Sequence, residues 1–279
     1  MHQPVRSELQ RNGYALSVQD WPVATVGALR GSVLLVHGLG EHVGRYDLLA
    51  RQLVQAGFAV RGYDHVGHGQ SGGRRGDLPQ PHQLVEDLGH VIDATRRLPG
   101  LTQLPLVLLG HSMGGLVAAR AVAENIRPID GLVMSSPALA AQISPLQKIL
   151  LATLPRWFPH VCVDNALDAR LVARSPQVVQ AYLQDPLVHR KISAGLAQWI
   201  LTEGAKTLAQ ASAWTVPTLL LYAGSDRLVD PQGSARFAAQ APASVVQAQV
   251  FEAMYHEIFN DPEAEQVFDV LIPWLTQRF

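Results

Sequence analysis

Residues 104–124, LPLVLLGHSMGGLVAARAVAE, decide the fold of this chain. The stretch opens with an apolar run, passes through GHSMG at 110–114, and continues with residues that favour a helix. Such a sequence predicts a strand that turns sharply into a helix. The small residues Gly110 and Gly114 permit a tight turn. We therefore expect Ser112 to be exposed at the apex of that turn.

Further apolar runs of the same kind lie on both sides of this stretch, and helical patterns separate them. Because helices cover both faces of a parallel sheet, its strands are typically unbroken apolar runs. The alternation predicts a doubly wound, mostly parallel α/β sheet with helices on both faces, and residues 14–22 as antiparallel edge strands. The predicted strands are 31–36, 58–63, 104–109, 129–134, 216–222 and 245–251, and the predicted helices include 45–56, 83–97 and 115–125.

Residues 138–213 interrupt the alternation. No strand pattern is evident there, and prolines at 145, 155, 159, 176 and 186 divide helical stretches. In open α/β sheets, ligands bind outside the carboxyl ends of the strands, which an insertion at this point would cover. We therefore expect a core of residues 1–137 and 214–279 and an all-helical cap, or lid, of residues 138–213.

Composition narrows the class of protein. The chain has 279 residues, 48% of them hydrophobic, and a formal net charge of -1, so nothing indicates a nucleic-acid partner. Its single cysteine, Cys162, excludes an intrachain disulfide and a cysteine-rich metal site. Residues 1–20 lack the apolar segment of a signal peptide, and no apolar stretch reaches the roughly 20 residues of a membrane span. These features predict a soluble, cytoplasmic protein.

The pattern G-x-S-x-G occurs twice, at residues 69–73 and 110–114. In the α/β-hydrolase fold this motif carries a serine nucleophile between a strand and a helix. Ser112 has that context, whereas Ser71 precedes the loop sequence GGRRGDLP. Ser112 is therefore the predicted nucleophile.

Chain order selects the partners of that serine, because in this fold the acid and then the histidine follow the nucleophile. Of the eleven histidines, only His256 lies beyond the last two predicted strands. Asp226 follows the strand at 216–222 and is the predicted acid, with Asp230 as the alternative. His256 would take the proton of Ser112, and Asp226 would orient the imidazole and stabilise its charged form.

Two backbone N–H groups would stabilise the oxyanion of an acyl-transfer intermediate. One belongs to Met113, the residue after the nucleophile. The other lies in the loop after the strand at 31–36, where Leu39 stands between two glycines. No cofactor or metal is expected.

Several stretches together resemble the monoglyceride lipase family, also described as bacterial lysophospholipases and serine aminopeptidase-like hydrolases. The resemblance implies an α/β-hydrolase with Ser112, Asp226 and His256 as its triad. It also implies hydrolysis of monoacylglycerols or related single-chain lipid esters without a cofactor. The alternatives are a lysophospholipase or broad carboxylesterase and, from another class, a non-catalytic relative that binds a ligand. The stretches are HGLGEHVGRYDLLA from His37, YDHVGHGQSGG from Tyr63, GHSMGG from Gly110, AYLQDPLVH from Ala181, GSDRLVD from Gly224 and AMYHEIFND from Ala253.

Other residues are candidates for substrate binding. Glu41 and Arg45 are spaced to pair on one helical face, either contacting the head group or fixing the loop as an ion pair. The apolar stretch at 146–158 contributes Leu150, Leu151 and Leu154, which would line an acyl-chain tunnel. The same stretch could contact membranes or micelles transiently, or it could simply pack on the core.

Overall fold

The computed structural model describes residues 3–11, 13–23, 29–141 and 153–279. Within these residues, an 8-stranded sheet forms the centre of the molecule. All its pairings are parallel except those of β1 with β2 and of β2 with β4. The strands, in spatial order, are β1 (Val5–Arg11), β2 (Tyr14–Trp21), β4 (Phe58–Tyr63), β3 (Gly31–Val36), β5 (Leu106–His111), β6 (Gly131–Ser135), β9 (Thr218–Ala223) and β10 (Val246–Phe251).

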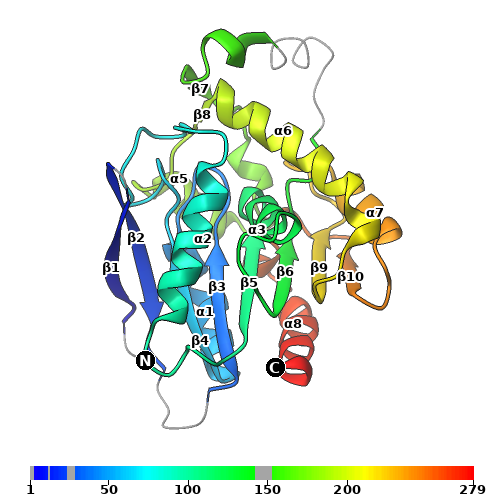
Figure 1. The fold of residues 1–279 in the computed structure, drawn as a ribbon. Helices are drawn as coiled ribbons and strands as arrows, with labels where there is room; N and C mark the ends of the chain where they lie inside the picture. Colours follow the sequence, from blue (N-terminus) through cyan, green and yellow to red (C-terminus); the bar gives the residue numbers. More distant parts are fainter. Residues whose placement is uncertain (1–2, 12, 24–28, 142–152) are drawn as a thin grey trace.

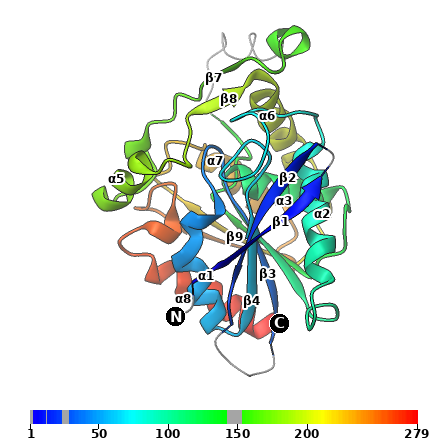
Figure 2. The same cartoon turned by 90° about the vertical axis from the view of Figure 1, so that its left-hand side faces the viewer.

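Helices cover both faces of the sheet, and α1 and α8 lie on the opposite side from α2 and α3 (Figure 2). Strand β3 explains the arrangement, because its side chains alternate between two hydrophobic clusters. Leu34 and Val36 belong to one cluster, and Val33 and Leu35 belong to the other. The helices are α1 (Asp47–Gln55), α2 (Gln83–Arg96), α3 (Met113–Ala123), α5 (Pro176–Gln184), α6 (Ala194–Ala209), α7 (Pro231–Gln240) and α8 (Glu265–Arg278), and the short 3-10 helices are η1 (Val43–Tyr46), η2 (Ala169–Leu171), η3 (Ala211–Ala213) and η4 (Ile258–Asn260).

The predicted α/β fold is confirmed, and each of the six predicted core strands is present with ends that shift by at most two residues. The segment at 14–22, predicted as antiparallel edge strands, forms β2, which is antiparallel to both neighbours but second from the edge, because β1 pairs with it. Strand β1 was not predicted; most of its side chains are exposed, so it carries no apolar signal.

Within the described part of the segment between β6 and β9, helix α6 and strands β7 (Cys162–Asp164) and β8 (Lys191–Ser193) lie beyond the carboxyl ends of the parallel strands (Figure 1). The expectation that this segment contains no strand is wrong. Strands β7 and β8 pair there as a small antiparallel sheet. Each has three residues, which is too short for a period-2 pattern to be visible in the sequence.

Candidate active site

Ser112 lies at the turn between β5 and α3, as predicted, and its backbone is strained. Its φ of 55° and ψ of -122° fall where non-glycine residues are rarely found. Its N–H donates to the carbonyl oxygen of Ser135 at 2.9 Å, which fixes the turn. A Cβ added at Gly110 would overlap the carbonyl oxygen of Gly114, so the tight turn requires this glycine.

His256 and Asp226 form a buried pair at the ends of β9 and β10. The His256 Nδ1 lies 2.6 Å from Asp226 Oδ2. The other oxygen of Asp226 accepts the N–H groups of Leu228 and Val229 at 2.9 and 3.0 Å. With Nδ1–H directed at the carboxylate, the Nε2 atom of His256 is available as a base.

The charges of this pair shift both pKa values. Burial favours the neutral acid at Asp226, but the charge and hydrogen bond of His256 and the two backbone donors outweigh it and lower the pKa. Burial also disfavours protonated His256. The charge of Asp226 and its hydrogen bond, assisted by Glu257 and Glu41, outweigh that effect and raise the pKa of His256. Each partner therefore favours the charged form of the other.

A cavity of about 720 Å³ brings the predicted residues together, since Ser112, His256, Leu39 and Met113 all line it. Most of the other lining residues are apolar, and many come from α6 and from the 138–141 segment. The catalytic roles of these residues stay predictions, but all four border the same space. The apolar lining includes Ala138, Leu139, Ala140, Ala141, Leu171, Val172, Ile192, Ala197, Ile200, Leu201, Ala205, Leu208, Leu228 and Val229.

Glu41 fixes the loop that carries Leu39. One oxygen of its buried carboxylate accepts the N–H of Gly38 and the hydroxyl of Tyr46, each at 2.6 Å. The other oxygen accepts Arg45 Nη1 at 2.8 Å. This geometry matches the loop-fixing alternative for Glu41 and Arg45. Glu41 also lines the cavity, so its contact with substrate stays a prediction.

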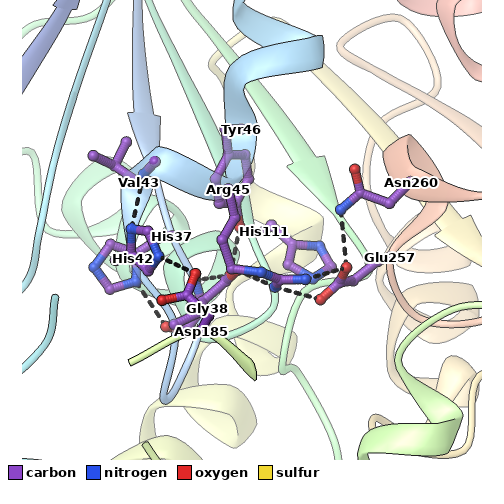
Figure 3. Close-up of polar contacts among 12 residues, drawn as sticks. His37, Gly38, His42, Val43, Arg45, Tyr46, His111, Asp185, Glu257 and Asn260 are labelled. Atoms are coloured by element: carbon purple, nitrogen blue, oxygen red, sulfur yellow. Dashed lines mark hydrogen bonds and ion pairs between the residues drawn. The ribbon is translucent and has the colours of Figure 1, made fainter. Parts of the chain in front are cut away.

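Glu257, the residue after His256, was missed at the sequence level. Its carboxylate binds Arg45 through two hydrogen bonds, of 2.6 and 2.9 Å, and accepts Asn260 Nδ2 at 2.9 Å (Figure 3). The Arg45 guanidinium also lies 4.7 Å from the ring centre of Tyr182. Arg45 and Glu257 are 212 positions apart, so no local pattern could have revealed the pair.

The competing candidates have structural roles. Ser71 is buried, and its hydroxyl donates to the carbonyl of Asp64 at 2.5 Å and accepts the N–H of Ser17 at 2.8 Å. Asp230 accepts the N–H of Gln232 and caps α7, with no bond to His256 among the described contacts.

The predicted tunnel residues fall partly outside the structure. Leu150 and Leu151 lie outside the described residues. Leu154 is 39% exposed and is not among the described residues that line the cavity. Its predicted contact with an acyl chain stays a prediction.

Comparison with known proteins gives a consistent family assignment. The serine aminopeptidase S33 family (Hydrolase_4) matches residues 27–263. A relative named monoacylglycerol lipase, from Mycolicibacterium smegmatis, is 37% identical over 89% of each chain. A relative named phospholipase YtpA, from Bacillus subtilis, is 32% identical over 89% of this chain and 93% of its own. Among the described residues, no helix is both long and apolar enough to cross a bilayer; the cytoplasmic location stays a prediction.

The solved structures agree with the sequence relatives. The crystal structure of a monoacylglycerol lipase from Paleococcus ferrophilus superposes with a TM-score of 0.83 at 31% identity, covering the whole of both chains. The family resemblance expected from the sequence is thereby confirmed. The chain belongs to the serine aminopeptidase S33 family and is a serine hydrolase related to the monoacylglycerol lipases.

Proposed function

We propose that this enzyme hydrolyses the ester bond of monoacylglycerols or similar single-chain lipid esters through an acyl-enzyme on Ser112. The observation that carries the proposal is the 2.6 Å pair of His256 with Asp226, in which His256 lines the same mostly apolar cavity as Ser112. Its volume of about 720 Å³ suits one acyl chain and lies within the usual range for small-ligand sites.

The reaction follows from the chemistry of these groups. The Ser112 hydroxyl attacks the ester carbonyl while His256 Nε2 takes its proton. The N–H groups of Leu39 and Met113 stabilise the resulting oxyanion. The His256 imidazolium then protonates the departing alcohol, leaving the acyl group on Ser112. Water, deprotonated by His256, releases the fatty acid and restores the serine.

A substrate panel tests this proposal. Turnover would be compared on a long-chain monoacylglycerol, a lysophosphatidylcholine of the same acyl chain, and a short p-nitrophenyl ester. We expect the monoacylglycerol to have the highest kcat/KM. A large preference for the short ester, with the lipid inert, would refute the lipid assignment.

Lysophospholipid hydrolysis is the second candidate, because a relative is named a phospholipase and Arg227 and Arg236 line the cavity. The lysophosphatidylcholine in the same panel decides between the two lipids. A non-catalytic, ligand-binding protein is the candidate of another class. Labelling of the wild type by a fluorophosphonate, absent in Ser112→Ala, would exclude it.

We also propose that the cap segment, residues 138–213, acts as a lid that contacts lipid surfaces. Four large apolar side chains near β7 are exposed: Trp157 by 76%, Phe158 by 58%, Val163 by 55% and Val161 by 44%. Large exposed apolar patches mark interaction sites. The guanidinium of Arg74 lies close to these side chains, since its Nη1 donates to the carbonyl oxygen of His160 at 3.1 Å.

Co-sedimentation with vesicles tests this contact. The Trp157→Ser/Phe158→Ser variant should lose binding to vesicles of phosphatidylcholine with phosphatidylglycerol, while its turnover of a soluble short ester is kept. Leu48→Ser is the matched control, since Leu48 is 49% exposed on α1. Equal vesicle binding by the wild type and the double variant would contradict the proposal.

A further inference from the structure

Asn165 contributes an unused hydrogen-bond donor to the wall of the cavity that holds Ser112. It lies in the loop between β7 and η2 and lines that cavity. Its Nδ2 is buried and has no hydrogen-bond partner in the part of the chain that the structure describes. A buried donor without a partner is unfavourable, so such groups are uncommon in folded proteins.

The orientation of the Asn165 amide is fixed by its other polar groups. Its Oδ1 accepts the N–H of Leu167 at 3.0 Å, and its backbone N–H donates to the carbonyl of Arg190 at 2.9 Å. The next residue, Ala166, has a strained φ of 56°. Because Oδ1 is held by the turn, a flip of the amide would sacrifice an existing bond, and Nδ2 stays unpaired.

The loop after β3 locates this donor relative to the reacting ester. A Cβ added at Gly38 would lie 3.1 Å from Ser112 Cβ. One added at Gly40 would lie 3.6 Å from Asn165 Nδ2. Two residues span at most roughly 7 Å. The donor therefore lies beside the loop that carries Leu39, the predicted oxyanion donor, in the wall of the same cavity as Ser112.

We propose that Asn165 determines specificity by donating a hydrogen bond to a hydroxyl oxygen on the alcohol part of the substrate. An acyl chain offers no acceptor, whereas the alcohol part of a polyol monoester offers hydroxyls within a few bonds of the ester. This inference rests on the proposed function and narrows it to esters whose alcohol carries a free hydroxyl. A site that offers a donor discriminates against the analogue that lacks the acceptor.

The test compares two esters of one acyl chain, a monoacylglycerol and the methyl ester, in four proteins. Asn165→Asp keeps the acceptor for Leu167 but loses the donor, and Asn165→Leu loses both. Asp164→Asn is the matched control, because Asp164 accepts the N–H of Ala166 in the same loop but is exposed and outside the cavity lining. The melting temperature of each protein checks its folding.

We expect Asn165→Asp to lower kcat/KM on the monoacylglycerol by about 10-fold, the scale of one hydrogen bond, and to change it less than two-fold on the methyl ester. Asp164→Asn should leave the ratio between the esters unchanged. The inference would be overturned, and the proposed function left standing, if kcat/KM fell equally on both esters. The same would follow if the ratio of kcat/KM between the two esters were unchanged in both Asn165 variants. A wild type that hydrolyses only the methyl ester would overturn it together with the proposed function.

Discussion

At the scale of single residues, Ser112 shows how the fold holds the predicted nucleophile. Its φ of 55° would relax in a flexible chain, so the surrounding contacts must hold it. The backbone bond to Ser135 and the close approach of Gly110 to Gly114 supply that restraint. A side chain held in this way loses little freedom when the substrate binds.

The choice between the two aspartates leads to a mutational prediction. Asp226→Asn should lower kcat by about 10⁴-fold, because the amide favours the wrong tautomer of His256. Asp230→Asn should change kcat less than two-fold, because asparagine also caps helices well. Steady-state kinetics on one ester checks both variants. A severe effect of Asp230→Asn beside a mild one of Asp226→Asn would identify Asp230 as the acid.

Glu257 should influence the pH dependence of the reaction. Because the proposed mechanism uses neutral His256 as the base, kcat/KM should rise as the pH increases through the raised pKa of His256. Glu257→Gln removes a negative charge and leaves Arg45 less compensated, and both changes lower the pKa of His256. Asp226 and Glu41 continue to raise that pKa, and His111 stays neutral beside it, its own pKa lowered by burial to about 4.

The acid limb of the kcat/KM profile should therefore move to lower pH in Glu257→Gln. Glu265→Gln, which makes the same charge change on the exposed first turn of α8, should leave the limb in place. A shift to higher pH in Glu257→Gln would show that the charge of Glu257 does not act on His256.

At the scale of elements, a buried ion pair joins α3 to α6. Arg120 Nε lies 2.8 Å from Glu203 Oε2 as an ion pair without an aligned hydrogen bond, and both residues are less than 8% exposed. Arg120 also binds Gln210 at 2.6 Å. On the other side, Glu203 binds the more exposed Lys206 at 2.8 Å. The pair thus connects the helix after the nucleophile to the helix that lines the cavity.

Replacing one member of this ion pair should lower the free energy of unfolding more than replacing both members. Arg120→Met leaves a buried carboxylate and should lower the free energy of unfolding by about 3 kcal/mol. Arg120→Met/Glu203→Leu should recover most of that loss. Urea denaturation of the three proteins measures the difference. If the double variant were no more stable than Arg120→Met, the loss would come from the missing ion pair and not from an unpaired carboxylate, which would contradict this prediction.

The sequence predicts elements well where burial leaves a pattern. Strands β3 and β4 are predicted residue for residue, because both faces are covered and the runs are unbroken. The pair of Asp226 and His256 follows from chain order. Strand β8, the contact of Arg45 with Glu257, and the position of Asn165 are set by segments far apart in the chain. Local periodicity carries no information about such contacts.

At the scale of the whole molecule, five histidines, four of them buried and His189 half-buried, have lowered pKa values. They lie in or beside the loops of the candidate active site, and burial is the largest cause of the shift in each: His37, His65, His68, His111 and His189. The pKa values of His111 and His189 fall to about 4. In the unfolded chain each would take up a proton near pH 6.5.

A folded pKa below the unfolded one means that the unfolded state binds more protons as the pH falls. The stability that these histidines contribute is complete above about pH 6.5 and is lost below it, by up to roughly 1.4 kcal/mol per pH unit for each proton. His256 has the opposite effect on stability, because its pKa is raised on folding, but it is one group against five. Melting temperature should therefore drop steeply from pH 7 to pH 5. A constant or rising melting temperature over that range would show that the five histidines do not control the stability of the fold.

One contact between the core and the segment above it has a mechanical consequence. His189 donates its backbone N–H to the carbonyl of Gly40 at 2.8 Å, and a Cβ on Gly40 would lie only 2.5 Å from the His189 carbonyl. The loop before β8 is therefore tied directly to the loop after β3, which carries the predicted oxyanion donor Leu39. A ligand that separated these two loops would displace the N–H of Leu39 and so inhibit the proposed reaction, without occupying the cavity proposed for the lipid.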